Sequence, residues 1–204
     1  MEGLSTETPL KAALDCIIRG PLRTAPNCVI ALVGLSGVGK SDSATYLHHA
    51  HGFSVLRSES VHMALFGRIK GMPPENYGYS AGVFQQTAQR YVQTGHALVL
   101  DATNLRRIYR DQLRVLFAGI AVVDFLHIVC EPELAFARAS GRAGTAELLD
   151  PQTRMDRPTF DMLAGMYEPP DADEGATTIT SDDVLKGQLD NYVRGLQRKL
   201  QART

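Results

Sequence analysis

Residues 34–41 have the types and spacing that bind phosphate groups. They read Gly-Leu-Ser-Gly-Val-Gly-Lys-Ser, which matches the Walker A pattern G-x-x-x-x-G-K-[ST]. The glycines let the backbone curl so that successive N–H groups point at phosphate oxygens. Lys40 adds a positive charge for the β- and γ-phosphates of a nucleotide, and the Ser41 hydroxyl is placed to ligate Mg2+. The predicted nucleotide contacts are Gly34, Ser36, Gly37, Val38, Gly39, Lys40, Ser41 and Asp42.

The segments on either side of this loop have the character that a phosphate-binding loop requires. Residues 28–33 form a short apolar run, as expected of a buried parallel strand, and residues 43–50 are predicted to be helical. A helix that starts here would add its positive N-terminal end to the anion site. The alternative, an ordinary glycine-rich turn, does not require this order of strand, loop and helix.

Apolar runs alternate with amphipathic segments along the rest of the chain. Strands are predicted at residues 28–33, 53–56, 97–101, 121–129 and 177–180. Helices are predicted at residues 8–19, 43–50, 58–66, 79–94, 107–117, 132–142, 160–167 and 184–201, with loops at 67–78 and 143–157. This alternation predicts an α/β fold of three layers, in which a five-stranded parallel sheet is covered on both faces.

Two acidic residues follow predicted strands, where ligands of parallel sheets bind. Asp101 ends the strand at 97–101, so it is a candidate to hold Mg2+ through water or to contact an acceptor. Glu59 follows the strand at 53–56 and is a candidate base for an acceptor hydroxyl. Two alternatives stay open: Asp101 as a solvated loop residue, and Glu59 as a first-turn residue favoured by the helix dipole. His62 would share a face with Glu59 and either binds the acceptor or lies on the surface.

Arginines recur at helical spacing in two places. Arg138 and Arg142 are four residues apart and either clamp phosphates, beside a lid formed by residues 143–157, or form a solvated basic face. Arg106, Arg110 and Arg114, with Arg107 beside them, form a stripe that either binds a polyanionic acceptor or lies exposed to solvent.

Composition sets limits on the class of protein. The chain has 204 residues, a net charge of −1 and 44% hydrophobic residues, which is typical of one globular domain without a global basic field. The three cysteines are scattered, which favours reduced thiols in the cytosol. No apolar stretch of membrane-spanning length and no signal-peptide pattern occurs. We therefore expect a cytoplasmic protein with no membrane association, and we predict no protein partner.

Together these residues resemble the kinase branch that contains bacteriophage-type polynucleotide 5′-hydroxyl kinases and zeta-toxin-like kinases. The resemblance spans residues 29–182 and rests on the loop at 34–41, Ser58-Glu59-Ser60-Val61-His62, Leu100-Asp101-Ala102-Thr103-Asn104-Leu105, and the pair Arg138 and Arg142. It implies a nucleotide-kinase-like P-loop NTPase fold in a single domain, 1–204. Residues 1–26 would form an N-terminal helical extension, and residues from about 132 to 170 an arginine-bearing helical lid.

The resemblance also implies residue roles. Glu59 stands at the position of the general base, Arg138 and Arg142 at those of the lid arginines, and Asp101, Thr103 and Asn104 near the acceptor or metal. Polynucleotide kinases usually have Asp at the base position and Arg three residues later, where this chain has Glu59 and His62. Neutral His is a poorer phosphate clamp than Arg, which leaves room for a smaller acceptor. The residues expected to bind the acceptor are His62, Tyr77, Thr103, Asn104 and Arg107.

The sequence thus predicts a kinase that uses ATP and Mg2+ to phosphorylate a hydroxyl group. Lys40, Glu59, Asp101, Arg138 and Arg142 are its expected catalytic residues, and Ser41 and Asp101 its expected metal ligands. The acceptor is either a nucleic-acid 5′ end or a small molecule such as a sugar, nucleoside, nucleotide sugar or antibiotic. A rival of another class is an ATP-binding regulatory or assembly protein without turnover.

Overall fold

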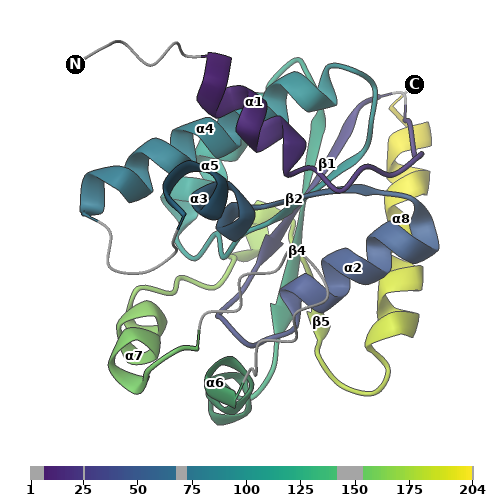
Figure 1. Ribbon diagram of the computed structural model, residues 1–204. Helices are drawn as coiled ribbons and strands as arrows, with labels where there is room; N and C mark the ends of the chain where they lie inside the picture. The colour runs from purple at the N-terminus through teal and green to yellow at the C-terminus, as the bar shows by residue number, and fades with distance from the viewer. Residues whose placement is uncertain (1–6, 25, 68–72, 142–153, 204) are drawn as a thin grey trace.

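The fold is built on one parallel sheet. The computed structural model describes residues 7–24, 26–67, 73–141 and 154–203 (Figure 1). Its five strands lie in the order β2-β3-β1-β4-β5, and every neighbouring pair is parallel. Their bounds are Cys28–Val33 for β1, Ser54–Arg57 for β2, Leu98–Asp101 for β3, Val122–Val129 for β4 and Thr177–Thr180 for β5. The five-stranded parallel sheet predicted from the sequence is confirmed.

Helices cover both faces of the sheet (Figure 1). On one face lie α2 (Lys40–His51) and α8 (Leu185–Gln201); on the other lie α1 (Glu7–Asp15), α4 (Pro74–Val92) and α5 (Arg107–Phe117), with α3 (Ser58–Phe66) packed on α1 and α4. All six residues of β1 are buried, because both of its faces are covered by a hydrophobic core. Helices α6 (Pro132–Gly141) and α7 (Arg157–Gly165) lie at the end of the sheet where β4 points, at the bottom of Figure 1.

The helix α4 begins earlier than the sequence predicted. Residues 74–78, expected to be part of a loop, form its first turn. Proline tolerates the first turn of a helix because its missing N–H has no partner there in any case, so Pro74 starts this helix and does not interrupt it. Residues 68–72 of that predicted loop and residues 143–153 of the predicted lid segment lie outside the described residues. Within the described parts of the chain, no helix has the length and apolar character needed to cross a membrane.

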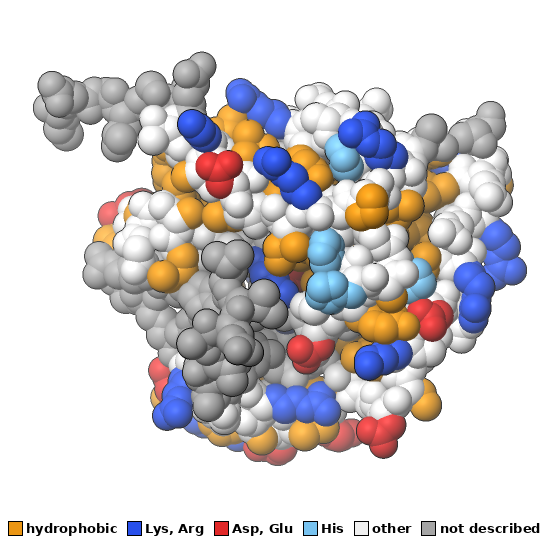
Figure 2. All heavy atoms as spheres, turned by 45° about the vertical axis from the view of Figure 1, so that its right-hand side comes forward, with side chains coloured by type: hydrophobic (Ala, Val, Ile, Leu, Met, Phe, Trp, Pro, Cys, Tyr) orange, Lys and Arg blue, Asp and Glu red, His pale blue; other side chains and the backbone are white. Residues whose placement is uncertain are grey.

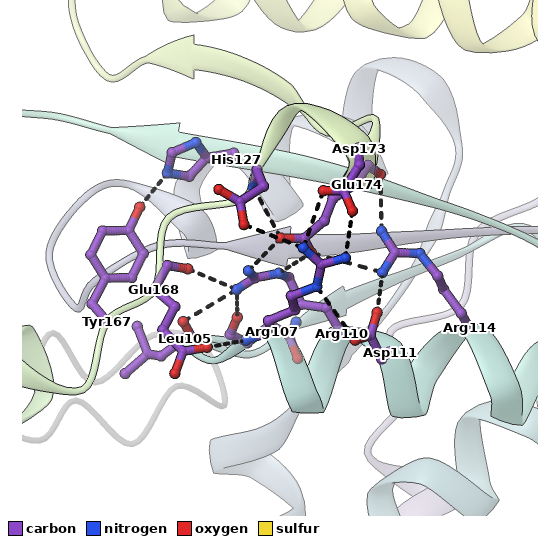
Figure 3. A network of polar contacts seen from close by, with 12 residues as sticks. Leu105, Arg107, Arg110, Asp111, Arg114, His127, Tyr167, Glu168, Asp173 and Glu174 are labelled. Carbon is purple, nitrogen blue, oxygen red and sulfur yellow. Dashed lines mark hydrogen bonds and ion pairs between the residues drawn. The ribbon is translucent and has the colours of Figure 1, made fainter.

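The arginine at the centre of α5 is buried and ion-paired (Figure 3). Arg110 has no exposed surface, and its Nε and Nη2 atoms donate to the Glu174 carboxylate at 2.6 and 2.7 Å. Its Nη1 atom donates to the carbonyls of Asn104, Leu105 and Glu168 at 3.1, 3.2 and 3.0 Å. These bonds fasten the segment between α7 and β5 to α5.

The rest of the arginine stripe contacts the same segment. Arg106 pairs with Glu168, Arg107 with Asp171 and Asp173, and Arg114 with Asp111 and the Glu174 carbonyl. Neither interpretation of the stripe holds for Arg110. It is not exposed to solvent, and it is not open to a polyanion because the carboxylate of Glu174, distant in sequence, neutralises it. Positive side chains on the face shown in Figure 2 are likewise interspersed with neutral, apolar and acidic ones.

The buried ion pair gives the stability of the fold a defined pH dependence. Hydrogen bonds from Arg110 lower the pKa of Glu174 to about 2. A carboxyl whose pKa is lower in the folded chain than in the unfolded chain stabilises the fold above its unfolded pKa. We therefore expect this contribution to be complete above about pH 4.5 and to be lost as the pH falls towards about 2.

Removal of one partner tests this network. Arg110→Met leaves the Glu174 carboxylate buried without its cation, so we expect the free energy of unfolding at pH 7 to fall by about 3–5 kcal/mol. Arg106→Met, which removes a half-exposed pair with Glu168, should cost less than about 1 kcal/mol. Urea denaturation measures both. Equal losses in the two variants would show that the buried pair does not hold the segment.

Candidate active site

The phosphate-binding loop lies in a pocket at the carboxyl ends of three neighbouring strands. Residues of the β1–α2 loop, the β2–α3 junction and the loop after β3 line it together. They meet because β1 neighbours β3 and β3 neighbours β2, so the three strand ends lie side by side at one edge of the sheet. Of the predicted site residues, the pocket brings together Ser36, Gly37, Lys40, Ser41, Glu59, Asp101 and Thr103.

The loop backbone has the curled conformation that phosphate binding needs. Gly34, Gly37 and Gly39 all have positive φ angles, of 144°, 85° and 94°. At Gly37 the fit to α6 is also close, since a Cβ atom would lie 2.0 Å from the carbonyl oxygen of Ala135. Only glycine satisfies both the backbone angle and this approach. Phosphate binding by this loop therefore depends on backbone shape as well as on charge.

Lys40 is held within the loop by its own backbone. Its ammonium group is largely buried and donates to the carbonyls of Gly34 and Leu35 at 2.9 and 2.7 Å. Lys40 and Ser41 are the first residues of α2, so the positive end of the helix faces the pocket. Two other predicted contacts do not present side chains to the pocket: Val38 is packed in the core and Asp42 is exposed on α2.

The two acids predicted to act in the site both line the pocket. Glu59 is in the first turn of α3 and is exposed, whereas Asp101 ends β3 and is almost fully buried. Arg57, the last residue of β2, is in register with Asp101 and its Nε atom lies 3.5 Å from Oδ2 of that carboxylate. Sequence reasoning missed Arg57, although a charged residue directly after an apolar strand was a signal for it.

The oxygen donors of the pocket suit a magnesium ion bound together with phosphate. The Ser41 hydroxyl and the carboxylates of Glu59 and Asp101 are hard oxygen ligands of the kind Mg2+ prefers. No group of three or more His, Cys, Asp or Glu side chains that could hold a metal occurs among the residues that the structure describes. The arrangement therefore suits an ion whose remaining ligands are phosphate oxygens and water, as in nucleotide sites.

A second cavity of about 260 Å3 adjoins the phosphate pocket, and Ser58, Ala102 and Thr103 line both. His62 lies in its wall with Nδ1 3.0 Å from the Ser58 carbonyl, and the Ser80 hydroxyl lies 2.9 Å from the same nitrogen. The Tyr77 ring is 5.3 Å from the His62 ring, although Tyr77 itself does not line the cavity. The cavity is placed where an acceptor would meet a bound phosphate.

The remaining predicted acceptor residues lie in different surroundings. Asn104 lines the second cavity, but its Nδ2 atom donates to the Leu32 carbonyl at 2.7 Å, so it links the loop after β3 to β1. Arg107 lies outside both cavities and pairs with Asp171 and Asp173. These contacts give Asn104 and Arg107 structural roles that the sequence pattern did not indicate.

One of the two predicted lid arginines lies close to the phosphate-binding loop. Arg138 is exposed on α6 and its Nη1 atom donates to the Ser181 hydroxyl at 3.0 Å. Ser181 follows β5, and its hydroxyl would be 2.7 Å from a Cβ atom at Gly39. Arg138 is therefore separated from the loop backbone by one side chain. Arg142 lies outside the described residues.

A methyl group added at Gly37 tests whether nucleotide binding depends on the conformation of this loop. Gly37→Ala should weaken ATP binding by roughly 5- to 150-fold, because about 1–3 kcal/mol of strain falls on the loop. Gly82→Ala is the matched control, since nothing lies within 4 Å of its added Cβ and its helical position should gain about 0.5–1 kcal/mol of stability. Calorimetric titration with ATP, at a temperature where both variants are folded, measures the effect. Unchanged affinity in Gly37→Ala would mean that nucleotide does not use this loop.

Solved structures of similar fold include several kinases. A gluconokinase from Sinorhizobium meliloti 1021 is 19% identical, with a TM-score of 0.60 over 87% of this chain and 95% of that chain. A sugar kinase from Janibacter sp. HTCC2649 is 20% identical, with a TM-score of 0.64 over 84% and 95%. Chaetomium thermophilum Kti12, solved in complex with ADP-AlF3, is 15% identical, with a TM-score of 0.63 over 82% and 97%. The chain therefore has a P-loop kinase-like fold.

Sequence comparison gives the family directly. No curated protein matches the chain. A family model described as AAA domain (AAA_33) matches residues 29–170, which include the phosphate-binding loop, Glu59, Asp101 and Arg138. Because the matched segment covers more than half of the chain and contains the pocket described above, the protein belongs to the AAA_33 family of AAA domains.

Proposed function

We propose that this protein is an ATP-dependent kinase that transfers the γ-phosphoryl group to a hydroxyl acceptor. The observation that carries the proposal is one pocket in which a phosphate-binding loop, Lys40 and the Glu59 carboxylate converge, with a second cavity beside it. A protein that only binds nucleotide has no need of a carboxylate and an acceptor cavity at the same strand ends. Two of the similar structures are named as a gluconokinase and a sugar kinase, which supports the same function.

The donor half of the proposed site is the loop and its surroundings. Backbone N–H groups of the loop, the N-terminus of α2 and Lys40 would hold the triphosphate. Lys40 would exchange the carbonyls of Gly34 and Leu35 for phosphate oxygens. Arg138, with Arg142, would add positive charge from the lid. The ADP-AlF3 in the Kti12 structure supports a nucleotide as the donor bound by this fold.

The proposed reaction is a direct displacement at phosphorus. The oxygen of the acceptor hydroxyl forms a bond to the γ-phosphorus, and the bond from this phosphorus to the β–γ bridging oxygen breaks. ADP leaves with the electron pair, and the hydroxyl proton passes to Glu59. Arg57 would stabilise negative charge at the transferring group and orient Asp101, its partner at 3.5 Å. Mg2+ held by Ser41, and by Asp101 directly or through water, would neutralise charge on the β- and γ-phosphates.

Exchange of one carboxylate for an amide tests the proposed base. Glu59→Gln should retain ATP binding and lose transfer by roughly 100- to 10,000-fold, because the amide cannot accept the hydroxyl proton. Glu75→Gln is the matched control, since Glu75 is also in the first turn of a helix but lies outside the pocket. The measurement follows label from γ-32P-ATP into oligonucleotides, nucleosides, sugars and antibiotics. Equal rates in both variants would favour the alternative that Glu59 is only a first-turn residue stabilised by the helix dipole.

The same assay distinguishes a kinase from an ATP-binding regulatory or assembly protein. A regulatory or assembly protein without turnover would bind ATP and transfer label to none of these acceptors. A kinase consumes ATP in step with the appearance of labelled acceptor.

A further inference from the structure

We infer that the cavity between α3, α4 and α5 selects a small, uncharged, polyhydroxylated acceptor, such as a sugar or nucleoside. This inference rests on the proposed function, which supplies the phosphoryl donor in the adjoining pocket. The inference limits the acceptor to one chemical class of hydroxyl compounds. Three properties of the cavity support this inference: its size, the absence of charge in its described lining, and its polar groups.

The size of the cavity favours a small molecule. Its volume is about 260 Å3, at or just below the range of roughly 300–1,000 Å3 that is usual for ligand sites. It is enclosed by helices on three sides and joins the phosphate pocket at Ser58, Ala102 and Thr103. An acceptor seated there would direct one hydroxyl towards Glu59 and the γ-phosphate. A monosaccharide-sized molecule suits this space.

The charge of the lining favours a neutral acceptor. Among the residues described, no Lys, Arg, Asp or Glu lines this cavity. A phosphate-bearing or cationic acceptor would therefore find no counter-charge among the described lining residues and would lose part of its hydration, which is costly. The arginines of the neighbouring helix α5 do not supply that charge, because Arg107 and Arg110 are paired with carboxylates of the segment before β5.

The polar groups of the lining match a ring that carries several hydroxyls. Phe84 and Leu113 give the cavity an apolar wall, and both are almost fully buried. Gln85 and Gln112 also line it, and no hydrogen bond within the described part of the chain occupies either side-chain amide. A side-chain amide both donates and accepts hydrogen bonds, as a hydroxyl does. Each glutamine can therefore donate to a hydroxyl of a polyol or accept from one. An apolar wall with a few placed polar groups is the usual composition of a small-molecule site.

His62 is fixed as part of this wall. Its Nδ1 atom lies 3.0 Å from the Ser58 carbonyl, and the hydroxyl of Ser80, which is buried on α4, lies 2.9 Å from Nδ1 and 3.1 Å from Nε2. This imidazole stands where the sequence resemblance places the phosphate-binding Arg of polynucleotide kinases. Because it is bonded to two protein groups, it closes the cavity at that point and does not reach outward to a phosphate. This placement also favours an uncharged acceptor over a nucleic-acid end.

Matched pairs of ligands test the inference without relying on turnover. Glucose with glucose 6-phosphate, and adenosine with 5′-AMP, are titrated against the protein saturated with a non-hydrolysable ATP analogue, and a 5′-hydroxyl oligonucleotide is added for comparison. The side-chain amide NMR resonances of Gln85 and Gln112 report binding. We expect an uncharged member to shift both resonances and to bind at least about tenfold more tightly than its phosphorylated counterpart, with little dependence on salt.

Two variants test whether the uncharged acceptor binds in this cavity. Gln85→Ala should raise the KM for the uncharged acceptor by about 5- to 20-fold while the KM for ATP stays unchanged, since one hydrogen bond is lost. Gln86→Ala, at the exposed neighbouring position on the same helix, is the control and should change neither. Tighter binding of the phosphorylated members or the oligonucleotide, or no amide shift with any uncharged member, overturns the inference. Amide shifts without phosphoryl transfer would instead contradict the proposed kinase function and leave the ligand class standing.

Discussion

The order of the strands is the constraint on which the site depends. Because β1 lies beside β3 and β3 beside β2, three loops distant in the sequence end at one edge of the sheet. Two hydrogen bonds fix the loops to each other: Gly34 N donates to the Thr103 carbonyl at 3.1 Å, and Asn104 Nδ2 donates to the Leu32 carbonyl at 2.7 Å. The phosphate-binding loop and the groups proposed to serve the acceptor are thereby held in a fixed relation, which direct transfer between two bound substrates requires.

The buried Arg110 connects this edge of the sheet to the segment between α7 and β5. Its guanidinium bonds to the carbonyls of Leu105 and of Asn104, which lines the proposed acceptor cavity, and to Glu174 on the segment before β5 (Figure 3). A planar group with five donors can satisfy a carboxylate and several carbonyls at once, which Lys cannot do. Because it is buried and paired with Glu174, Arg110 is not available to bind a polyanion.

Local patterns predicted much of the fold and several of the residues that line the phosphate pocket. The strands β1 and β5 and the helix α5 have the predicted bounds, because apolar runs and helical periodicity are local signals. Lys40, Glu59 and Asp101 were found because their positions depend on a motif and on strand ends, and the topology places all three in one pocket.

Features that depend on tertiary contacts were not predictable from one sequence. Arg110 is separated from Glu174 by 64 residues, so no local spacing indicated its burial. Three residues of the second cavity, His62, Thr103 and Asn104, were predicted as acceptor residues, but the cavity itself was not predicted. Its walls come from facing surfaces of α3, α4 and α5, and residues such as Phe84, Gln85 and Gln112 carry no motif. Arg57 was overlooked although its place after an apolar strand was a local signal, and its pairing with Asp101 depends on the register of β2 and β3.

The fate of the γ-phosphoryl group tests the central claim most directly. The protein is mixed with γ-32P-ATP and a cell extract filtered to contain only small molecules, and the labelled products are separated. The account predicts that label moves to a small hydroxyl compound, that none moves when the extract is omitted, and that the product without its new phosphate is uncharged. Label found only as inorganic phosphate, released at the same rate with and without the extract, would contradict it.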